Sequence, residues 1–600
     1  MMTNITSRIL RPSTLGGSQK GASLSRILRP STIGGSRWGA LALLLLFPLL
    51  CIGQTRAVFD YANYTAAEAD SKLMPLGGGC APDPTILRVG DDYYLANSSF
   101  SYYPGVPIWH STDLKHWKRL GYVLNRPSQL MLKDGIKMRE GVYAPHLSYN
   151  PATKTYYMIS TLIAGGGTFY VTTTDPKSGK WSDPVWLKDI DGIDPSFFFD
   201  DNGKGYVLHN AWRDQHWKSH CDIWCKPFDP QTGQTFGEER LIVYGGADTL
   251  SHPQWLEGPH MYKVGHRYIV MCAEGGTGEN HSVVVFEGSD PMGRFTPCAI
   301  NPILTQRDVE GAPMTPVTCT GHADLVETKG GDWYAVFLGV RPYEKNYDLM
   351  GRETFMLPVK WVTPDGKNAR PAEPHAQPLI LEKGKKLTPK EGKDQLRTLW
   401  DKNGIAPDAF TIRTPMDLRT PFANADNGPV GVDAIVSKDG RGVFSLKKNA
   451  LTIVASEKGV EDKTSPAAIG QWVTQSKFTY ETRVTFDPKD ENSLAGIVLF
   501  YDDQRYMQFG VSADSDGSPC LRIKASLGDF QVNSHNWKIK TTKEVRLRAV
   551  VDGKGHVYFS FLIGGGAAWR NVGMPLSLTQ LTSKEANGFT GLMVGLFARE

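Results

Sequence analysis

The chain has 600 residues, which is too long for a single hydrophobic core, so we expect two or more domains. Apolar residues make up 40% and charged residues 21%, the proportions of an ordinary soluble globular protein. The formal net charge is +4, but residues 1–57 hold seven Lys/Arg and no Asp/Glu, so the remainder carries about −3. Residues 58–600 therefore carry no excess of positive charge, which excludes nucleic acid as the expected partner.

The first 57 residues predict a leader rather than a folded domain. A basic Gly/Ser-rich phrase occurs twice, at 7–18 and 25–36, and is typical of a disordered segment. The apolar run at 39–52 is short for a membrane span and suits the apolar core of a signal peptide, with a cleavage position after Ala57. We therefore expect a secreted protein, extracellular or periplasmic, with no stable membrane span.

Cleavage there would remove Cys51 and leave seven cysteines, an odd number that implies a free thiol or an intermolecular bridge. Cys221 and Cys225 have the spacing of half a metal site, but no second Cys/His pair follows at ligand spacing. We expect them to form a local disulfide or to be two buried thiols.

One phrase then occurs five times: a polar or acidic lead-in, a short apolar stretch, a turn of Gly, Asp or Lys, and an aromatic strand. The five copies span residues 81–98, 144–161, 193–210, 257–274 and 322–339. A second hairpin follows most copies, so each repeat is long enough for a four-stranded blade. The sequence therefore predicts a five-bladed β-propeller over residues 58–368, with the lead-ins converging at one end of its channel.

The sequence pattern changes after the repeats. Residues 369–398 are rich in Pro, Lys, Gly and Asp and predict a linker. Short alternating segments separated by turns fill residues 399–600 and predict a β-sandwich. Helical periodicity is scarce throughout, so the expected fold class is all-β.

Three of the five lead-ins carry an acid: Asp83, Asp194 and Glu257. Asp-Pro pairs are ordinary turn formers, and the chain has seven of them. Asp83 and Asp194 differ from the others because each directly precedes the innermost strand of a blade, and we place Glu257 at the equivalent position of the fourth blade. Glycoside hydrolysis needs one carboxylic acid to protonate the leaving oxygen and one carboxylate to activate water or attack carbon. A third carboxylate can raise the pKa of the acid.

The remaining lead-ins contribute other chemistry. Tyr143, before the second copy, could wall a sugar site. His322 is either a structural histidine or, on the channel axis, a residue that holds a cation or tunes a neighbouring charge. Arg352, before the last propeller strand, could grip sugar hydroxyls or pair with one of the acids.

At these residues the chain resembles glycoside hydrolase family 43, especially its β-xylosidase-type members. The motifs follow in that family's order: APDPTILRVGDDYYLANSSF, RPSQL, GVYAPHLSY, GIDPSFFFDDNGKGYV, EGPHMYK, GHADLV and GRETFMLPVKW. The resemblance covers about residues 77–365, and the predicted sandwich is similar to the family's C-terminal lectin-like, concanavalin-type domain.

The resemblance implies an inverting mechanism, with Asp83 as general base, Glu257 as general acid and Asp194 as pKa modulator. An inverting pair should stand about 6.5–9.5 Å apart to admit the attacking water. Further implied positions are a substrate-contacting Arg352, an axial His322 that supports calcium in some members, and Phe100 and Tyr143 as aromatic pocket residues. The resemblance implies that no cofactor is required. It leaves open whether a Ca²⁺ ion binds in the propeller channel at His322.

Two departures from the family pattern leave substrate choice and local structure open. The family often has Trp where Tyr143 stands, and the GGGC stretch at 77–80 is unusual, so the role of Cys80 is not predicted. In related enzymes the sandwich helps to close the active site, which favours a pocket and exo action.

The leading hypothesis is a secreted exo-glycosidase that removes xylose from the non-reducing ends of xylo-oligosaccharides or hemicellulose side chains. Cleavage of α-L-arabinofuranosides is a second activity, because the two sugars can present similar hydroxyl geometry. An arabinan-specific α-L-arabinofuranosidase or arabinanase is an alternative. A retaining fructan-cleaving enzyme is a further alternative, but this sequence lacks the WMNDPNG-like opening that is usual in such enzymes. The last alternative is a non-catalytic glycan-binding protein, which would not need all three acids. The natural polymer and the oligomeric state stay open.

Overall fold

The computed structural model describes residues 55–66, 74, 76, 78–387 and 442–600, together with short strand pairs between 400 and 436. Within these ranges it leaves out 127, 131, 133–134, 313–315, 345, 448–449, 464–465, 565 and 567. The predicted leader lies almost wholly outside the described residues. Among the helices that are described, none has the length and apolar character needed to cross a bilayer.

The all-β prediction is confirmed for the described chain. Its helical segments are short: α1 (Ser583–Ala586) and the 3₁₀ turns η1 (Pro176–Ser178), η2 (Thr249–Ser251) and η3 (Thr579–Leu581).

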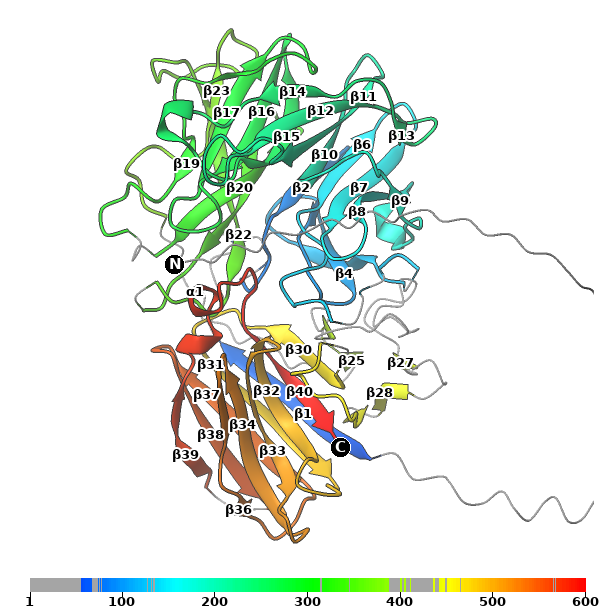
Figure 1. Cartoon of the computed structure of the whole chain (residues 1–600), viewed down its shortest axis with the longest axis vertical. Helices are drawn as coiled ribbons and strands as arrows, with labels where there is room; N and C mark the ends of the chain where they lie inside the picture. The colour runs from blue at the N-terminus through cyan, green and yellow to red at the C-terminus, as the bar shows by residue number, and fades with distance from the viewer. Residues whose placement is uncertain are drawn as a thin grey trace, which may run out of the picture. The chain divides into compact units, whose positions relative to one another are not determined.

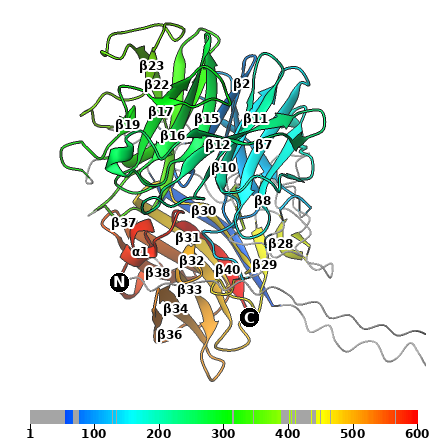
Figure 2. The same cartoon turned by 45° about the horizontal axis from the view of Figure 1, so that its top comes forward.

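Five antiparallel sheets follow one another between residues 85 and 379, and they occupy the blue-to-green upper part of Figure 1 and Figure 2. The first holds β2 (Thr85–Val89), β3 (Asp92–Ala96), β4 (Gly105–Ser111) and β5 (Lys118–Leu124). The second holds β6 (His146–Asn150), β7 (Thr155–Leu162), β8 (Gly167–Thr173) and β9 (Val185–Trp186). The third holds β10 (Ile193–Phe199), β11 (Gly205–Ala211), β12 (Asp222–Asp229), β13 (Gln234–Thr235) and β14 (Arg240–Val243).

The fourth sheet holds β15 (Glu257–Val264), β16 (Arg267–Glu274), β17 (Ser282–Gly288), β18 (Thr296–Pro297) and β19 (Leu304–Thr305). The fifth holds β20 (Thr318–Glu327), β21 (Trp333–Val340), β22 (Arg352–Val362) and β23 (Gln377–Leu379). The first strands of successive sheets contact one another, and β20 returns to contact β2. The lead-ins that precede or open these strands are therefore gathered around one axis.

The expected end of this domain at residue 368 is too early. Strand β23 pairs with β22, with Lys360 opposite Leu379, so part of the predicted linker 369–398 completes the fifth sheet. Leu379 and its neighbours pack on the apolar core shared by the fourth and fifth sheets. The Pro- and Lys-rich composition concealed a strand of three residues, which is too short for period-two alternation to show.

Four of the five lead-ins share a backbone conformation that explains their residue types. Asp83, Asp194 and His322 have φ values of 51°, 52° and 47°, and Gly258 has φ 57°. Aspartate, histidine and glycine are among the residues that tolerate this left-handed region. The strand register is interrupted at this place in β10, β15 and β20. Each such interruption turns the chain so that a side chain at the start of the strand faces the channel.

This alignment corrects one detail of the sequence analysis. Gly258, and not Glu257, takes the place of Asp83 and Asp194 in the fourth lead-in, and Glu257 stands one residue earlier, opposite Ala273 in the β-ladder. A Cβ atom on residue 258 would lie 2.9 Å from His322 Nε2. The fourth position therefore needs glycine, and the acid is displaced by one residue.

The rest of the described chain forms a sandwich of two sheets. One sheet has the order β27 (Ile435–Val436), β28 (Gly442–Lys447), β29 (Ala450–Val454), β1 (Arg56–Ala66), β31 (Lys477–Phe486), β37 (Val545–Asp552), β38 (His556–Ile563) and β39 (Arg570–Ser577). The other has β26 (Phe410–Thr411), β30 (Ala468–Trp472), β40 (Met593–Arg599), β32 (Leu494–Asp502), β33 (Arg505–Ala513), β34 (Pro519–Leu527) and β35 (Phe530–Asn533), with β36 (Trp537–Lys538) on β34. A separate pair is β24 (Trp400–Asp401) with β25 (Gly404–Ile405).

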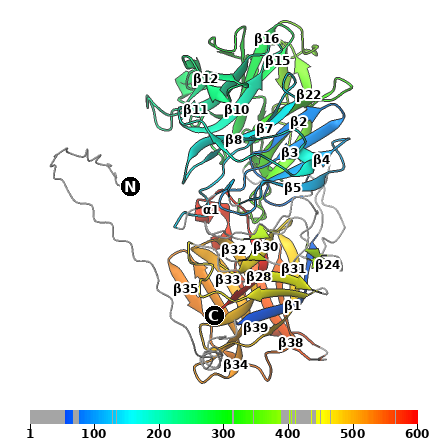
Figure 3. The ribbon, with the colours of Figure 1, turned by 90° about the vertical axis from the view of Figure 1, so that its right-hand side faces the viewer.

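Strand β1 belongs to this sandwich, so the expected propeller boundary at residue 58 is wrong. It pairs with both β29 and β31, and Figure 3 shows the blue strand among the yellow and orange ones. The strand already begins at Arg56, so cleavage after Ala57 would remove two of its paired residues. A pairing between residues about 400 positions apart leaves no local signal in the sequence.

The sandwich is apolar on the face that meets the propeller as well as in its own core. Strand β31 alternates buried and partly buried residues, as expected for a sheet with one solvated face, whereas eight of the nine residues of β32 are buried. Val498 and Phe500 pack in one cluster with Tyr102 and Tyr122 of the first blade. Burial of this shared surface joins the two domains.

Candidate active site

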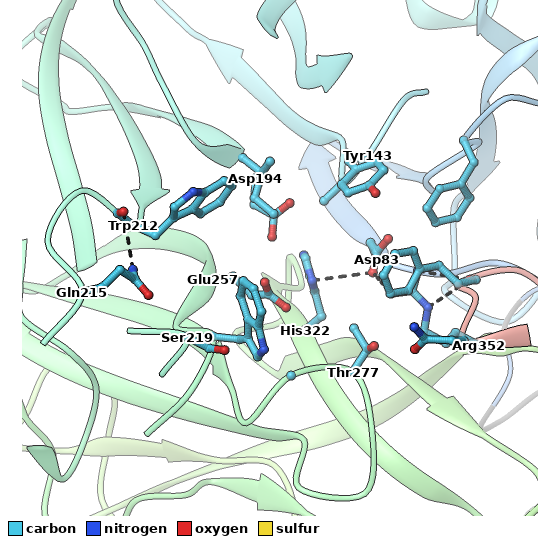
Figure 4. Close-up of a pocket in the computed structure, with 17 residues that line it drawn as sticks. Asp83, Tyr143, Asp194, Trp212, Gln215, Ser219, Glu257, Thr277, His322 and Arg352 are labelled. Carbon is cyan, nitrogen blue, oxygen red and sulfur yellow. Dashed lines mark hydrogen bonds and ion pairs between the residues drawn. The ribbon is translucent and has the colours of Figure 1, made fainter. Parts of the chain in front are cut away.

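A cavity of about 650 Å³ opens where the lead-ins meet, and it is lined by every site residue that the sequence analysis named. These are Asp83, Phe100, Tyr143, Asp194, Glu257, His322 and Arg352. Figure 4 shows Asp83, Asp194 and Glu257 pointing into the same space, with Arg352 beside Asp83 and Trp212 at the opposite end. The structure thus brings together all seven predicted residues.

Asp83 is held as an ionised carboxylate. Arg352 Nη1 donates to its Oδ1 at 2.7 Å, and Ser98 Oγ donates to its Oδ2 at 2.6 Å. Burial alone would raise the pKa of Asp83, but the Arg352 guanidinium and these hydrogen bonds outweigh it and place that pKa below its usual value. His322 Nδ1 lies 3.6 Å from the same oxygen, but burial lowers the pKa of His322 to about 4, so Arg352 is the cation that holds Asp83 at neutral pH.

Glu257 and Asp194 have the opposite electrostatic environment. Burial, and after it the charge of Asp83, raises the pKa of Glu257 to about 7. Burial and the charge of Glu257 place the pKa of Asp194 well above its usual value, although Gly258 N donates to Asp194 Oδ2 at 3.1 Å. Because the charge of Glu257 opposes the ionisation of Asp194, the two carboxyls titrate as a pair. One cavity therefore holds a carboxylate ready to accept a proton and a carboxylic acid ready to donate one.

The sandwich supplies one wall of the cavity through Phe589, which the sequence analysis did not identify. Arg352 Nε and Nη2 each donate to the Phe589 carbonyl oxygen at 3.2 Å. The Phe589 ring stacks at 6.4 Å on Phe100 and lies edge-on at 6.3 Å to Tyr143. Because Phe100 and Tyr143 themselves meet at 5.6 Å, the three rings enclose this end of the cavity.

The other end of the cavity is open and carries two exposed tryptophans. Trp212 is 46% exposed and Trp255 is 40% exposed. Gly276 lies against Trp255, since a Cβ atom there would stand 3.0 Å from Trp255 Cδ1. Flat exposed aromatic faces are surfaces on which sugar rings stack. In the sequence both tryptophans fall in connections between strands, and no pattern distinguished them from core aromatics.

A second layer of polar residues lies below the acids, two positions further along the lead-ins. Ligand atoms of His146, His260 and Asp324 lie within 4.8 Å of one another, and they are the cluster suited to a metal among the described residues. Both ring nitrogens of His260 are buried without a hydrogen-bond partner. Asp324 accepts hydrogen bonds from the side chains of Thr85 and Tyr262 and from two backbone amides.

The cluster of His146, His260 and Asp324 does not include His322, the residue at which Ca²⁺ was expected. Calcium prefers six to eight oxygen ligands, whereas His146, His260 and His322 offer nitrogen and both Asp324 oxygens already accept two hydrogen bonds each. A calcium ion in this channel would have to take most of its ligands from water.

The described cysteines are free thiols, so Cys221 and Cys225 are buried thiols and not a disulfide. Cys80 is buried behind the cavity wall, and burial raises the pKa of its thiol to about 12. A thiol of that pKa is protonated at neutral pH and has no role in proton transfer.

Comparison with known proteins agrees with the fold described above. Residues 73–367 match the model of Glycosyl hydrolases family 43, and residues 439–600 match the Beta xylosidase C-terminal Concanavalin A-like domain. The chain is 34% identical to a non-reducing end α-L-arabinofuranosidase of Bacteroides ovatus, over 90% of this chain and 93% of that protein. It is 30% identical to a xylosidase/arabinosidase of Butyrivibrio fibrisolvens, over 87% of this chain and 95% of that protein.

A solved structure is similar over nearly the whole chain. The crystal structure of a GH43_12 protein retrieved from capybara gut metagenome superimposes with a TM-score of 0.74 at 32% identity. The alignment covers 91% of this chain and all of that one, so it includes both the propeller and the sandwich.

Proposed function

The chain belongs to glycosyl hydrolases family 43 and is a glycoside hydrolase, and from this premise we propose that it releases single sugars from the non-reducing ends of glycans. The sugars released are α-L-arabinofuranose and β-D-xylose, and the substrates are hemicellulose side chains and oligosaccharides. The reaction inverts the configuration at the anomeric carbon. The observation that carries the proposal is the electrostatic division of the cavity. The pKa of Asp83 is held below its usual value while the pKa of Glu257 is raised to about 7.

This division is consistent with the two roles of an inverting pair. Ionised Asp83 accepts a proton from a water molecule as that water attacks the anomeric carbon. Protonated Glu257 donates its proton to the glycosidic oxygen as the bond to the leaving group breaks. Asp194 resists ionisation beside Glu257, so the pair holds its last proton more firmly than an isolated carboxyl would.

The shape of the cavity favours exo action. Phe100, Tyr143 and Phe589 close the end nearest Asp83 and Arg352, so only a terminal sugar fits there. Figure 4 places Trp212 at the other end, beyond Glu257, and this is the side toward which the leaving group departs. A remaining glycan chain would leave the pocket over the exposed tryptophans.

The choice of the two sugars is supported by the relatives. One is named for α-L-arabinofuranose at non-reducing ends and another for both xylose and arabinose. Two pentoses that present similar hydroxyls to Asp83 and Arg352 would share the closed end of the pocket.

Hydrolysis of 4-nitrophenyl α-L-arabinofuranoside and 4-nitrophenyl β-D-xylopyranoside tests the proposal, with the product anomer followed by NMR. We expect turnover of both substrates and an inverted anomer as the first product. Debranched arabinan should release arabinose alone; release of oligosaccharides would favour an arabinanase instead. Binding of xylo-oligosaccharides without any turnover would favour the glycan-binding alternative.

A further inference from the structure

A buried ion pair lies directly behind the catalytic arginine. Arg341 follows β21 and Glu353 is the second residue of β22, and they are 6% and 0% exposed. Arg341 Nε donates to Glu353 Oε2 at 2.7 Å, and Arg341 Nη2 donates to Glu353 Oε1 at 2.9 Å. Such a two-pronged contact fixes the orientation of both side chains as well as their separation.

The same guanidinium also binds the sandwich. Arg341 Nη1 donates to Gln475 Oε1 at 3.0 Å, and Nη2 donates to the Thr474 carbonyl oxygen at 2.8 Å. Both residues follow β30, and Thr474 N donates to Tyr64 Oη in β1 at 2.8 Å. The propeller pair is thus anchored to two strands of the sandwich.

The glycines that the sequence analysis left unexplained complete this cluster. Gly79 N donates to Glu353 Oε1 at 2.9 Å, and Gly78 and Gly79 have φ values of 97° and 91°. A Cβ atom on residue 78 would lie 3.1 Å from Glu353 Oε1, and one on residue 79 would lie 3.3 Å from Trp472 Cβ. Glycine is needed at both positions because the chain passes between the ion pair and the sandwich.

Two short routes lead from this cluster to the catalytic base. Arg352 precedes Glu353 in β22, and successive side chains of a strand point to opposite sides, so Glu353 reaches Arg341 while Arg352 reaches Asp83. The second route is the backbone from Gly79 to Asp83, which is fixed to the same strand where Ala81 N donates to the Arg352 carbonyl oxygen at 2.9 Å.

We infer that Arg341 and Glu353 are positioning residues that set the Asp83–Arg352 contact by anchoring both partners to the sandwich. The inference rests on the proposed role of Asp83 as the general base. Neither residue lines the cavity, so both act through Arg352 and the 79–83 backbone. Removing one partner leaves a buried charge uncompensated, and the strand that carries Arg352 must then shift.

The Glu353→Gln variant tests this, because it keeps the size of the side chain and removes its charge. We expect kcat to fall about 10- to 100-fold, the loss that a misplacement of about 1 Å produces. The acidic limb of the kcat/KM profile should also move to higher pH, since a displaced Arg352 holds the Asp83 charge less firmly. Arg341→Lys should retain more activity than Arg341→Met, because it keeps the buried positive charge.

Asp200→Asn is the matched control. Asp200 is a buried carboxylate that pairs with Lys263 Nζ at 2.8 Å, and it directly follows β10, at the opposite end of that strand from Asp194. This variant should lower the melting temperature without moving the acidic limb. If Glu353→Gln does not fold, Gln475→Ala removes only the side-chain contact from the sandwich to Arg341, leaves the contact with the Thr474 carbonyl in place, and should give a smaller shift of the limb in the same direction.

Wild-type enzyme and Asp83→Asn are measured alongside to separate the two claims. The positioning role alone would be overturned by two results together. Asp83→Asn would be inactive, while a folded Glu353→Gln or Gln475→Ala would keep both the wild-type kcat and the wild-type acidic limb. An equal limb shift in Asp200→Asn would overturn it as well. If Asp83→Asn kept wild-type turnover, the assignment of the base would fail instead.

Discussion

The two ends of the cavity are built in different ways. The end at Asp83 is made of buried charges and aromatic rings from both domains, and Arg352 joins it to the sandwich through the Phe589 carbonyl. The end at Trp212 and Trp255 is made of exposed side chains from the propeller alone. Bond cleavage needs fixed geometry and low solvation, whereas a leaving glycan of variable length needs an open surface. Damage to the closed end should therefore lower the rate of chemistry, and damage to the open end should change only substrate preference.

The largest effect is expected at the closed end from Asp83→Asn. Asparagine also tolerates the left-handed backbone at this position, so the fold should survive. Loss of the general base should lower kcat/KM by about 10³-fold or more. Steady-state kinetics and a melting curve check this, with Asp175→Asn, another Asp-Pro aspartate, as the control that should stay fully active.

Glu257→Gln should give the next largest effect, and its size should depend on the leaving group. We expect a loss of about 10²- to 10³-fold on oligosaccharides, which need a proton donor, and a much smaller loss on a 2,4-dinitrophenyl glycoside, which does not. An equal loss on both substrates would show that Glu257 does not act as the acid.

Phe589→Ala removes the wall that the sandwich contributes. We expect kcat/KM to fall about 10- to 100-fold, because a buried aromatic contact stabilises by about 1.5–3 kcal/mol. Phe530→Ala, at a phenylalanine of the same sandwich that is 74% exposed, is the control and should bind substrate normally. Equal kcat/KM values in the two variants would mean that the sandwich does not shape the sugar site.

The smallest effect is expected at the open end. Trp212→Ala and Trp255→Ala should raise KM a few-fold for oligosaccharides, corresponding to about 1 kcal/mol of lost stacking. They should leave a methyl glycoside, which has almost no leaving group to stack, nearly unchanged. Leu250→Ala, at a side chain that is 91% exposed and does not line the cavity, serves as the control. A large fall in kcat on the methyl glycoside would contradict the division between the two ends.

Local repetition in the sequence was enough to predict the β-rich repeats and five of the seven predicted site residues, because each repeat carries the same lead-in before its first strand. Arg352 was predicted from its place before the last propeller strand, and Phe100 was expected from the family resemblance alone. Pairings across long sequence separations could not be predicted in this way. Strand β1 in the sandwich, Phe589 in the cavity and the Arg341–Glu353 cluster depend on contacts between residues that carry no shared local pattern. The displacement of Glu257 by one residue follows from the close approach of His322 to Gly258, which the spacing of the motifs did not reveal.

The pH dependence of kcat/KM for the wild-type enzyme tests the central claim most directly, namely that one carboxyl is ionised and another protonated in the same cavity. Asp83 must be ionised and its pKa lies below the usual value, so activity should persist to acidic pH and fall only below about pH 4. Glu257 must be protonated and its pKa is raised to about 7, so activity should fall as the pH rises through about 7. A bell-shaped profile with these two limbs is the expected result. A rate that already falls above about pH 4.5, the ordinary range of a glutamate, would contradict the account.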